Sequence, residues 1–185
     1  MSCIAKCCLI SLVAIFFSVL SVFSAFSAEI LQGKVIKVID GDTVTIVDDR
    51  GFRHRIRFSG IDAPEKNQPY GEESTKNLKL LVHNKRVLIE YSKYDRYDRI
   101  IGVVLVNQQS DLSCQEKDCV RKINVGLELI KNGLAWHYKK YQFEQREKER
   151  EDYSDAEINA REKKLGLWAD KESMPPWKWR KRRNR

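Results

Sequence analysis

The chain lacks the short motifs that identify several common enzyme classes. It has nine glycines among its 185 residues, and these form no Walker-type loop; a His-Glu-x-x-His pair and a serine elbow are also absent. Its three histidines, His54, His83 and His137, have no partners at metal-ligand spacing. There is no internal repeat. These absences exclude nucleotide-loop, zinc-peptidase and serine-hydrolase chemistry, and the histidines are expected to be surface or packing residues.

Cysteine is scarce once the N-terminus is set aside. Cys3, Cys7 and Cys8 lie near the start, which leaves Cys114 and Cys119 for the rest of the chain. Two cysteines without a nearby histidine or a further cysteine cannot complete a zinc site. They lie close together in the sequence, in a polar stretch between two apolar segments. In an oxidising compartment they could form a disulfide that closes a short loop.

Charged residues are almost absent from residues 1–28. Lys6 gives a positive start, the run that follows is apolar, and Ala25, Ser27 and Ala28 are small residues suited to cleavage. We expect a signal peptide and a secreted or periplasmic protein, with no stable membrane association after cleavage. The apolar run is also about long enough to span a bilayer, so an uncleaved N-terminal membrane anchor is the alternative.

The remainder of the chain is basic. The whole chain has a formal net charge of +8, and Lys6 is the only charged residue of the first 28, so the rest carries +7. A basic surface attracts phosphates and releases their counterions, which suits a DNA or RNA partner. Solubility alone explains the charge equally well. The length fits a single domain, and we expect a monomer.

Five segments have the β-branched content or the alternation typical of strands. The first two flank Asp40-Gly41-Asp42, a strong turn signal, and so indicate a hairpin. The last two are joined by the polar, aromatic sequence SKYDRYDR. The expected strands are residues 31–38, 43–47, 52–58, 86–91 and 100–106.

The third of these strands carries arginines on one face. Phe52, Ile56 and Phe58 alternate with three arginines, the last of which is Arg57. Side chains alternate between the two faces of a sheet, so the apolar face is expected to be buried. The other face would present guanidinium groups outward.

Helical spacing follows the third strand and dominates the last third of the chain. We expect a helix that runs to about Asn84, a short helix over 125–133 and a long charged helix over 143–165. Residues 171–185 show neither helical nor strand period and are expected to form a basic tail rich in Trp, Pro and Arg.

The order of these elements predicts the fold. Five strands with one helix between the third and the fourth are typical of a small closed barrel of the oligonucleotide-binding (OB) type. The expected fold is therefore α+β, a five-stranded OB-type β-barrel with three α-helices. Such a barrel leaves a groove for a nucleic-acid strand.

Three acids and two arginines supply the parts of a metal-assisted phosphodiesterase. Asp42 and Asp62 are carboxylates of the kind that a hard cation prefers. Glu65 lies close enough to Asp62 to act as a base on a metal-bound water. Arg57 and Arg99 are planar forks that can grip a phosphate. Taken alone, either aspartate is more often a turn or cap residue than a metal ligand.

The chain resembles the staphylococcal nuclease, or thermonuclease, family. The resemblance rests on VIDGDTV, RFSGIDAPE, YGEEST, YDRYDR, NVGLELIKNGLAW and KKLGLW, which occur in the family's order between Val35 and Trp168. It implies a nuclease domain over residues 29–170 and calcium-dependent endonuclease activity on DNA and RNA, in single strands or breathing duplexes. Cleavage would break the 5′ P–O bond and leave 3′-phosphate products.

The resemblance also implies a metal site. Asp42 and Asp62 would bind Ca²⁺ together with the main-chain carbonyl of Ala63, where the family usually has threonine. Glu65 would be the general base.

Two arginines and two tyrosines would meet the substrate. The resemblance assigns Arg57 and Arg99 to the scissile phosphate. Asp98 stands where the family more often has glycine, and an acid there could pair with Arg99 and lower activity. Tyr97 and Tyr141 resemble aromatics of the nucleotide pocket, although barrel packing accounts for such residues as often.

A noncatalytic reading is the alternative. A barrel of this type could bind nucleic acid at the cell surface or in the periplasm without cutting it. That reading predicts loss of the acids or the arginines, and all five are present.

Overall fold

The computed structural model describes residues 29–109 and 120–183. The expected signal peptide, residues 1–28, and the candidate disulfide, Cys114 with Cys119, lie outside the described residues. In the part of the chain that is described, no helix has the length and apolarity needed to cross a bilayer.

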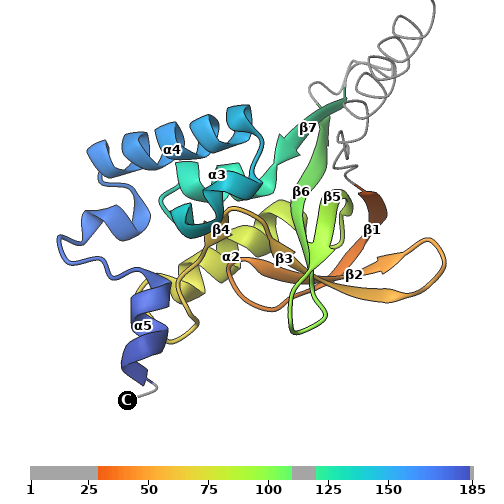
Figure 1. Cartoon of the computed structure of the whole chain (residues 1–185), viewed down its shortest axis with the longest axis horizontal. Coiled ribbons are helices and arrows are strands. Elements are labelled where there is room, and N and C mark those ends of the chain that lie inside the picture. Colours follow the sequence, from red (N-terminus) through yellow and green to blue (C-terminus); the bar gives the residue numbers. More distant parts are fainter. Residues whose placement is uncertain (1–28, 110–119, 184–185) are drawn as a thin grey trace, which may run out of the picture.

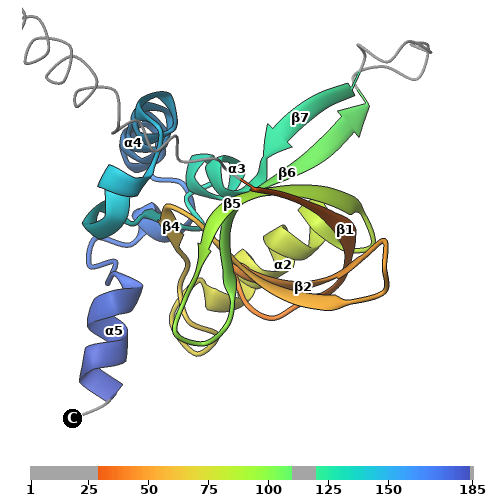
Figure 2. The ribbon, with the colours of Figure 1, turned by 45° about the vertical axis from the view of Figure 1, so that its right-hand side comes forward.

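Five strands close into a barrel, as predicted. Neighbouring strands pair antiparallel around the ring, and a parallel pairing between the third and the last strand closes it. Figure 2 looks into the ring, with helix α2 lying across one end. The barrel strands are β1 (Glu29–Val38), β2 (Thr43–Asp48), β3 (Arg53–Phe58), β5 (Arg86–Tyr94) and β6 (Ile100–Gln109).

Three further strands were not expected from the sequence. β7 (Val120–Asn124) pairs with the end of β6, and the two form an arm that projects from the barrel in both views (Figures 1 and 2). β4 (Ile61–Asp62) and β8 (Trp136–His137) form a separate two-stranded ladder. This short ladder joins the barrel to the helical half of the molecule.

The burial of side chains along β3 agrees only in part with the alternation predicted from the sequence. Ile56 and Phe58 are buried in the core, as expected. Phe52 was expected to be buried and is 60% exposed, because it precedes the strand in the β2–β3 turn. Arg57 was expected to point outward. Its side chain is only 15% exposed, because it turns toward buried carboxylates instead of solvent.

Four α-helices lie in the described residues: α2 (Gly71–Val82), α3 (Val125–Lys131), α4 (Glu147–Glu162) and α5 (Pro176–Arg183). The long helix expected over 143–165 is shorter, because residues 139–144 form a 3-10 segment and Gln145 is extended. The barrel core continues under α2 and α3 through Leu78, Val82, Leu129 and Ile130, which are fully buried.

The C-terminal tail is the main departure from the expected fold. It was predicted to have no regular structure, but residues 176–183 form α5. Pro176 occupies the first position, where a missing N–H costs no helical hydrogen bond. Eight residues are too few to show a helical period in the sequence, so a periodicity argument could not have found this helix.

One asparagine links α3 to α4. The Oδ1 atom of Asn124 accepts a hydrogen bond from the N–H of Leu127 at 3.1 Å, which caps α3. The same atom accepts one from the hydroxyl of Tyr153 at 3.0 Å. Tyr153 is 1% exposed, so its hydroxyl depends on this partner.

Asn124→Ala is expected to lower the free energy of unfolding by about 2 kcal/mol, because it removes the cap and leaves a buried hydroxyl unpaired. Tyr153→Phe removes only the hydroxyl and should cost about 1 kcal/mol. Urea denaturation of both single variants and the double variant measures the coupling. Strictly additive costs would contradict a stabilising hydrogen bond between Tyr153 and Asn124.

Candidate active site

Several chain segments bring their side chains to one pocket of about 770 Å³ at the side of the barrel. The β1–β2 turn, the end of β3, strand β4, the loop after β4, the β5–β6 loop, residues 138–144 and α5 all contribute. The pocket takes in every residue assigned from the sequence to catalysis, metal binding or substrate contact. These residues are Asp42, Arg57, Asp62, Ala63, Glu65, Tyr97, Arg99 and Tyr141.

The β1–β2 turn holds Asp42 in a fixed position. Its backbone N–H donates to Asp40 Oδ1 at 3.1 Å. Its carboxylate accepts hydrogen bonds from the hydroxyl of Thr43 at 3.0 Å and from the N–H of Ala63 at 2.8 Å. Gly41 is required for this packing, because a Cβ there would lie 2.1 Å from Ser74 Oγ and 2.7 Å from the Cβ of Ala63.

Arg57 lies between the two aspartates. Its Nη2 donates to Asp62 Oδ1 at 2.8 Å, and its Nη1 contacts Asp42 Oδ2. Both carboxylates are buried, with Asp42 5% and Asp62 0% exposed. A buried carboxylate needs an opposite charge to offset its lost hydration, so one guanidinium group serves two acids.

The ladder between β4 and β8 fixes Asp62. Asp62 pairs with Trp136 of β8 and Ile61 with His137. His137 is 2% exposed, and burial lowers the pKa of its imidazole. Asp62 therefore lies in a strand of its own, β4, which follows the third strand of the barrel.

Around the two buried aspartates, acids outnumber cations in the described part of the chain, because Asp40, Asp42, Asp62 and Glu65 have only Arg57 and Arg180 in contact with them. Burial, reinforced by the adjacent carboxylate of Asp42, raises the pKa of Asp40 to about 7. Burial also raises the pKa of Asp62, although hydrogen bonds from Arg180 and the charge of Arg57 oppose the shift. Both shifts have the direction expected where acids are short of a counter-cation.

The loop that carries Glu65 is held by its own hydrogen bonds. The N–H of Glu65 donates to Gln68 Oε1 at 3.2 Å, and the N–H of Gln68 donates to the carbonyl of Glu65 at 2.8 Å. Gly71 must be glycine here, because a Cβ would lie 1.9 Å from the carbonyl oxygen of Glu65. The carboxylate of Glu65 is therefore presented from a rigid loop beside Asp62.

Arg180 of α5 also enters the pocket, and sequence reasoning missed it. Its Nη2 donates to Asp62 Oδ2 at 2.8 Å, and its Nη1 donates to Asp62 Oδ1 at 3.2 Å and to Glu65 Oε1 at 2.8 Å. The only signal in the sequence was the basic run of the tail. That run does not distinguish Arg180 from its neighbours.

Asp98 does not pair with Arg99. Arg99 instead donates from Nε to Asp95 Oδ2 at 2.8 Å, and its Nη2 lies 2.7 Å from the same oxygen. Asp98 has a φ of 57°, a left-handed conformation that glycine adopts freely and aspartate tolerates. The glycine usual at this position is thus explained by backbone geometry.

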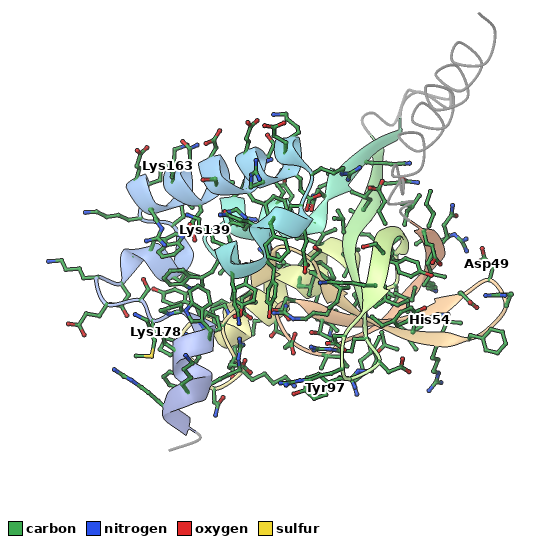
Figure 3. The ribbon with its side chains drawn as sticks, viewed as in Figure 1. Asp49, His54, Tyr97, Lys139, Lys163 and Lys178 are labelled. Atoms are coloured by element: carbon green, nitrogen blue, oxygen red, sulfur yellow. The ribbon has the colours of Figure 1, made fainter. Side chains whose placement is uncertain are left out.

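The two tyrosines lie on the rim of the pocket. Tyr97 is 59% and Tyr141 41% exposed, so neither is part of the barrel core. Figure 3 labels Tyr97 in the β5–β6 loop and Lys178 in the first turn of α5, both on the lower side of the view. The guanidinium groups of Arg96 and Arg99 lie 4.9 Å and 5.5 Å from the ring of Tyr97. An exposed ring with cationic neighbours suits contact with a nucleotide.

The donor set suits a hard cation. Among the described residues, no three histidine, cysteine, aspartate or glutamate side chains gather as a complete metal site. Asp42 and Asp62 offer two buried carboxylates, and Ala63, whose N–H donates to Asp42 Oδ2, lines the same pocket. Calcium takes oxygen ligands in irregular geometry and completes its shell with water, so this partial set fits it.

The fold and the pocket define a closed OB-type barrel with acids and guanidinium groups at one side. The sequence of residues 55–170 matches the family described as Staphylococcal nuclease homologue, and the chain belongs to this family. The matched range contains Arg57, Asp62, Glu65 and Arg99 and begins after Asp42.

Similar proteins occur in several bacteria. The chain is 36% identical over 176 residues to a Haemophilus influenzae protein named uncharacterized endonuclease, covering 95% of this chain and 85% of that protein. It is 37% identical over 167 residues to protein ParB of Escherichia coli, covering 90% and 88% of the two chains. It is 31% identical over 156 residues to a protein named micrococcal nuclease from Shigella flexneri, covering 81% and 80%.

Asp40→Asn is expected to stabilise the protein in chelator at pH 8. Because the pKa of Asp40 is raised on folding, the folded state binds more protons than the unfolded state between about pH 4 and 7, and stability falls as pH rises through this range. Asparagine keeps the Oδ1 acceptor without the charge. Urea denaturation should show a gain on the order of 1 kcal/mol at pH 8 that shrinks toward pH 4. A gain that is the same at both pH values would contradict the electrostatic origin.

Proposed function

We propose that this chain is a calcium-dependent endonuclease that hydrolyses DNA and RNA, in single strands or breathing duplexes, at the 5′ P–O bond. The coarser part of this proposal, hydrolysis of nucleic acid, is supported by membership of the nuclease family and by relatives named endonuclease and micrococcal nuclease. The finer part rests on the pocket. The observation that carries it is that two buried aspartates, a glutamate and two arginines from separate segments line one cavity.

Arg57 and Arg99 would bind the scissile phosphate. Both arginines line the pocket, Arg57 from β3 and Arg99 from the position immediately before β6. Guanidinium groups donate in a fixed fork, which suits the equatorial oxygens of a phosphate as negative charge builds on them. The pairing of Arg99 with Asp95 keeps its side chain in place before substrate arrives.

Asp42, Asp62 and the carbonyl of Ala63 would hold the metal. When bound there, calcium would supply positive charge to offset the charge that develops on the phosphate. The buried position of both carboxylates keeps water away from this charge and so strengthens its effect.

Glu65 would remove the proton from the attacking water. The water oxygen forms a bond to phosphorus as the bond from phosphorus to the 5′ oxygen breaks. The 5′ oxygen takes up a proton from solvent, which leaves a 5′-hydroxyl and a 3′-phosphate. Pro64 and the Gln68 hydrogen bonds restrict the loop, so Glu65 needs little ordering before reaction.

We also propose that the protein acts outside the cytoplasm, as a secreted or periplasmic monomer. The location rests on the sequence of residues 1–28, which has the features of a signal peptide. An uncleaved membrane anchor would place the same domain on the same side of the membrane.

Glu65→Gln should abolish most turnover while calcium binding is retained, because the amide cannot accept a proton from water. The assay is release of acid-soluble nucleotides from denatured DNA, with calcium and then with chelator. Glu73→Gln on the exposed face of α2 is the matched control and should behave as the unchanged protein. Nucleotide release by Glu65→Gln at the rate of the control would remove Glu65 from the role of base. DNA binding by the unchanged protein without any release would favour the noncatalytic barrel.

Arg57→Lys should reduce kcat/KM by about 100-fold or more, because an ammonium group cannot span two carboxylates and a phosphate. Arg55→Lys is the control, since Arg55 lies on the same strand and is exposed. Both variants keep the net charge, so the comparison isolates the fork geometry. Equal activity of the two variants would show that Arg57 does not bind the scissile phosphate through its guanidinium fork. Circular dichroism checks that Arg57→Lys still folds.

A further inference from the structure

Helix α5 is anchored beside the active site by contacts that do not involve charge. The ring of Trp177 lies 5.5 Å from the ring of Trp136 and 5.3 Å from that of Tyr138. The side-chain amide of Gln68 donates to the carbonyl of Met174 at 2.5 Å, immediately before the helix. Since Gln68 also hydrogen-bonds Glu65, the tail and the catalytic loop are joined through one residue.

The helical spacing then directs one arginine into the site. Arg180 lies three residues after Trp177, so both side chains leave α5 on the same face. The guanidinium group of Arg180 spans the two oxygens of Asp62 and also reaches Glu65. Its neighbours Lys178, Lys181 and Arg182 are exposed. Among the side chains of α5 that the structure describes, Arg180 is therefore the one that contacts the acids.

We propose that Arg180 is the resident counter-cation of the metal site, which competes with calcium for Asp62 and so sets the calcium affinity of the protein. This inference rests on the proposed role of Asp62 as a calcium ligand. It adds a residue from outside the barrel, and outside the range matched by the family, to the determinants of metal binding.

Competition follows from the geometry of Asp62. Both oxygens of this carboxylate accept hydrogen bonds from Arg180, and one also accepts from Arg57. Calcium would have to bind at least one of the same oxygens, in a carboxylate with no exposed surface. A guanidinium group and a calcium ion that share one buried carboxylate repel each other. Calcium binding therefore requires Arg180 to release Asp62.

The charges around Asp62 favour replacement of Arg180 by calcium. Without metal, Arg180 reduces the excess of negative charge around the buried Asp62. With calcium present, two positive charges replace the one that leaves. The side chain of Arg180 is 41% exposed, so it has solvent into which to move. Its release costs the interactions with Asp62 and Glu65, and this cost is subtracted from the affinity for calcium.

The test is calcium titration by isothermal calorimetry of the unchanged protein, Arg180→Ala and Arg182→Ala. Arg182→Ala removes the same charge from the same helix without touching the acids. We expect Arg180→Ala to bind calcium about tenfold more tightly than the unchanged protein, and Arg182→Ala to lie within about twofold of it. Arg180→Lys, which keeps the charge but not the fork, should fall between.

Thermal melting supplies a second readout that needs no turnover. In chelator, Arg180→Ala should melt several degrees below Arg182→Ala, because Asp62 loses one of its two cationic partners. Saturating calcium should reduce or reverse this difference, since calcium then occupies the position of the arginine.

The outcomes separate this inference from the proposed function. Equal calcium affinities for Arg180→Ala and Arg182→Ala, with binding intact, would overturn the competition alone. Absence of calcium binding in the unchanged protein and in every variant would overturn both the competition and the calcium requirement. Binding that becomes measurable only in Arg180→Ala would support the inference in its strongest form.

Discussion

The structure depends on the burial of one carboxylate, that of Asp62. A buried carboxylate costs several kcal/mol unless cations compensate it, and Arg57 from β3 and Arg180 from α5 supply that compensation. The ladder of β4 with β8 places Asp62 opposite Trp136, on which the helical half and the tail pack. Barrel and tail thus meet at a single buried carboxyl group, and the helical half packs on the residue paired with it.

The barrel could be predicted from the sequence because its signals are local. Alternation places Ile56 and Phe58 inward, and the Asp-Gly-Asp turn sets the hairpin that carries Asp42. The convergence of the acids and arginines was predicted through the family resemblance. Spacing along the chain does not reveal that Arg57 lies between Asp42 and Asp62.

The rest could not be predicted because it depends on contacts between distant residues. Arg180 and Asp62 are 118 positions apart, and their pairing follows from the docking of Trp177 on a two-residue strand that has no sequence signal. The sequence also suggested that Asp98 could pair with Arg99, and the structure shows a different partner. Backbone conformation, which turns Asp98 through a positive φ, leaves Asp95 as the partner of Arg99 instead.

The residues of α5 that pack against the protein are different from the residue that binds Asp62. Calcium could therefore replace Arg180 at Asp62 while the helix stays docked. Trp177 packs against a buried aromatic cluster and Pro176 is buried, so apolar contacts, which carry no charge for a metal to displace, hold the helix. Arg180 therefore needs to change only its side-chain torsions, a motion much faster than the undocking of a helix. A released guanidinium group would turn toward solvent, to which the side chain is already 41% exposed. The tail can thus oppose metal binding in the free protein and still leave the groove open once metal and substrate are present.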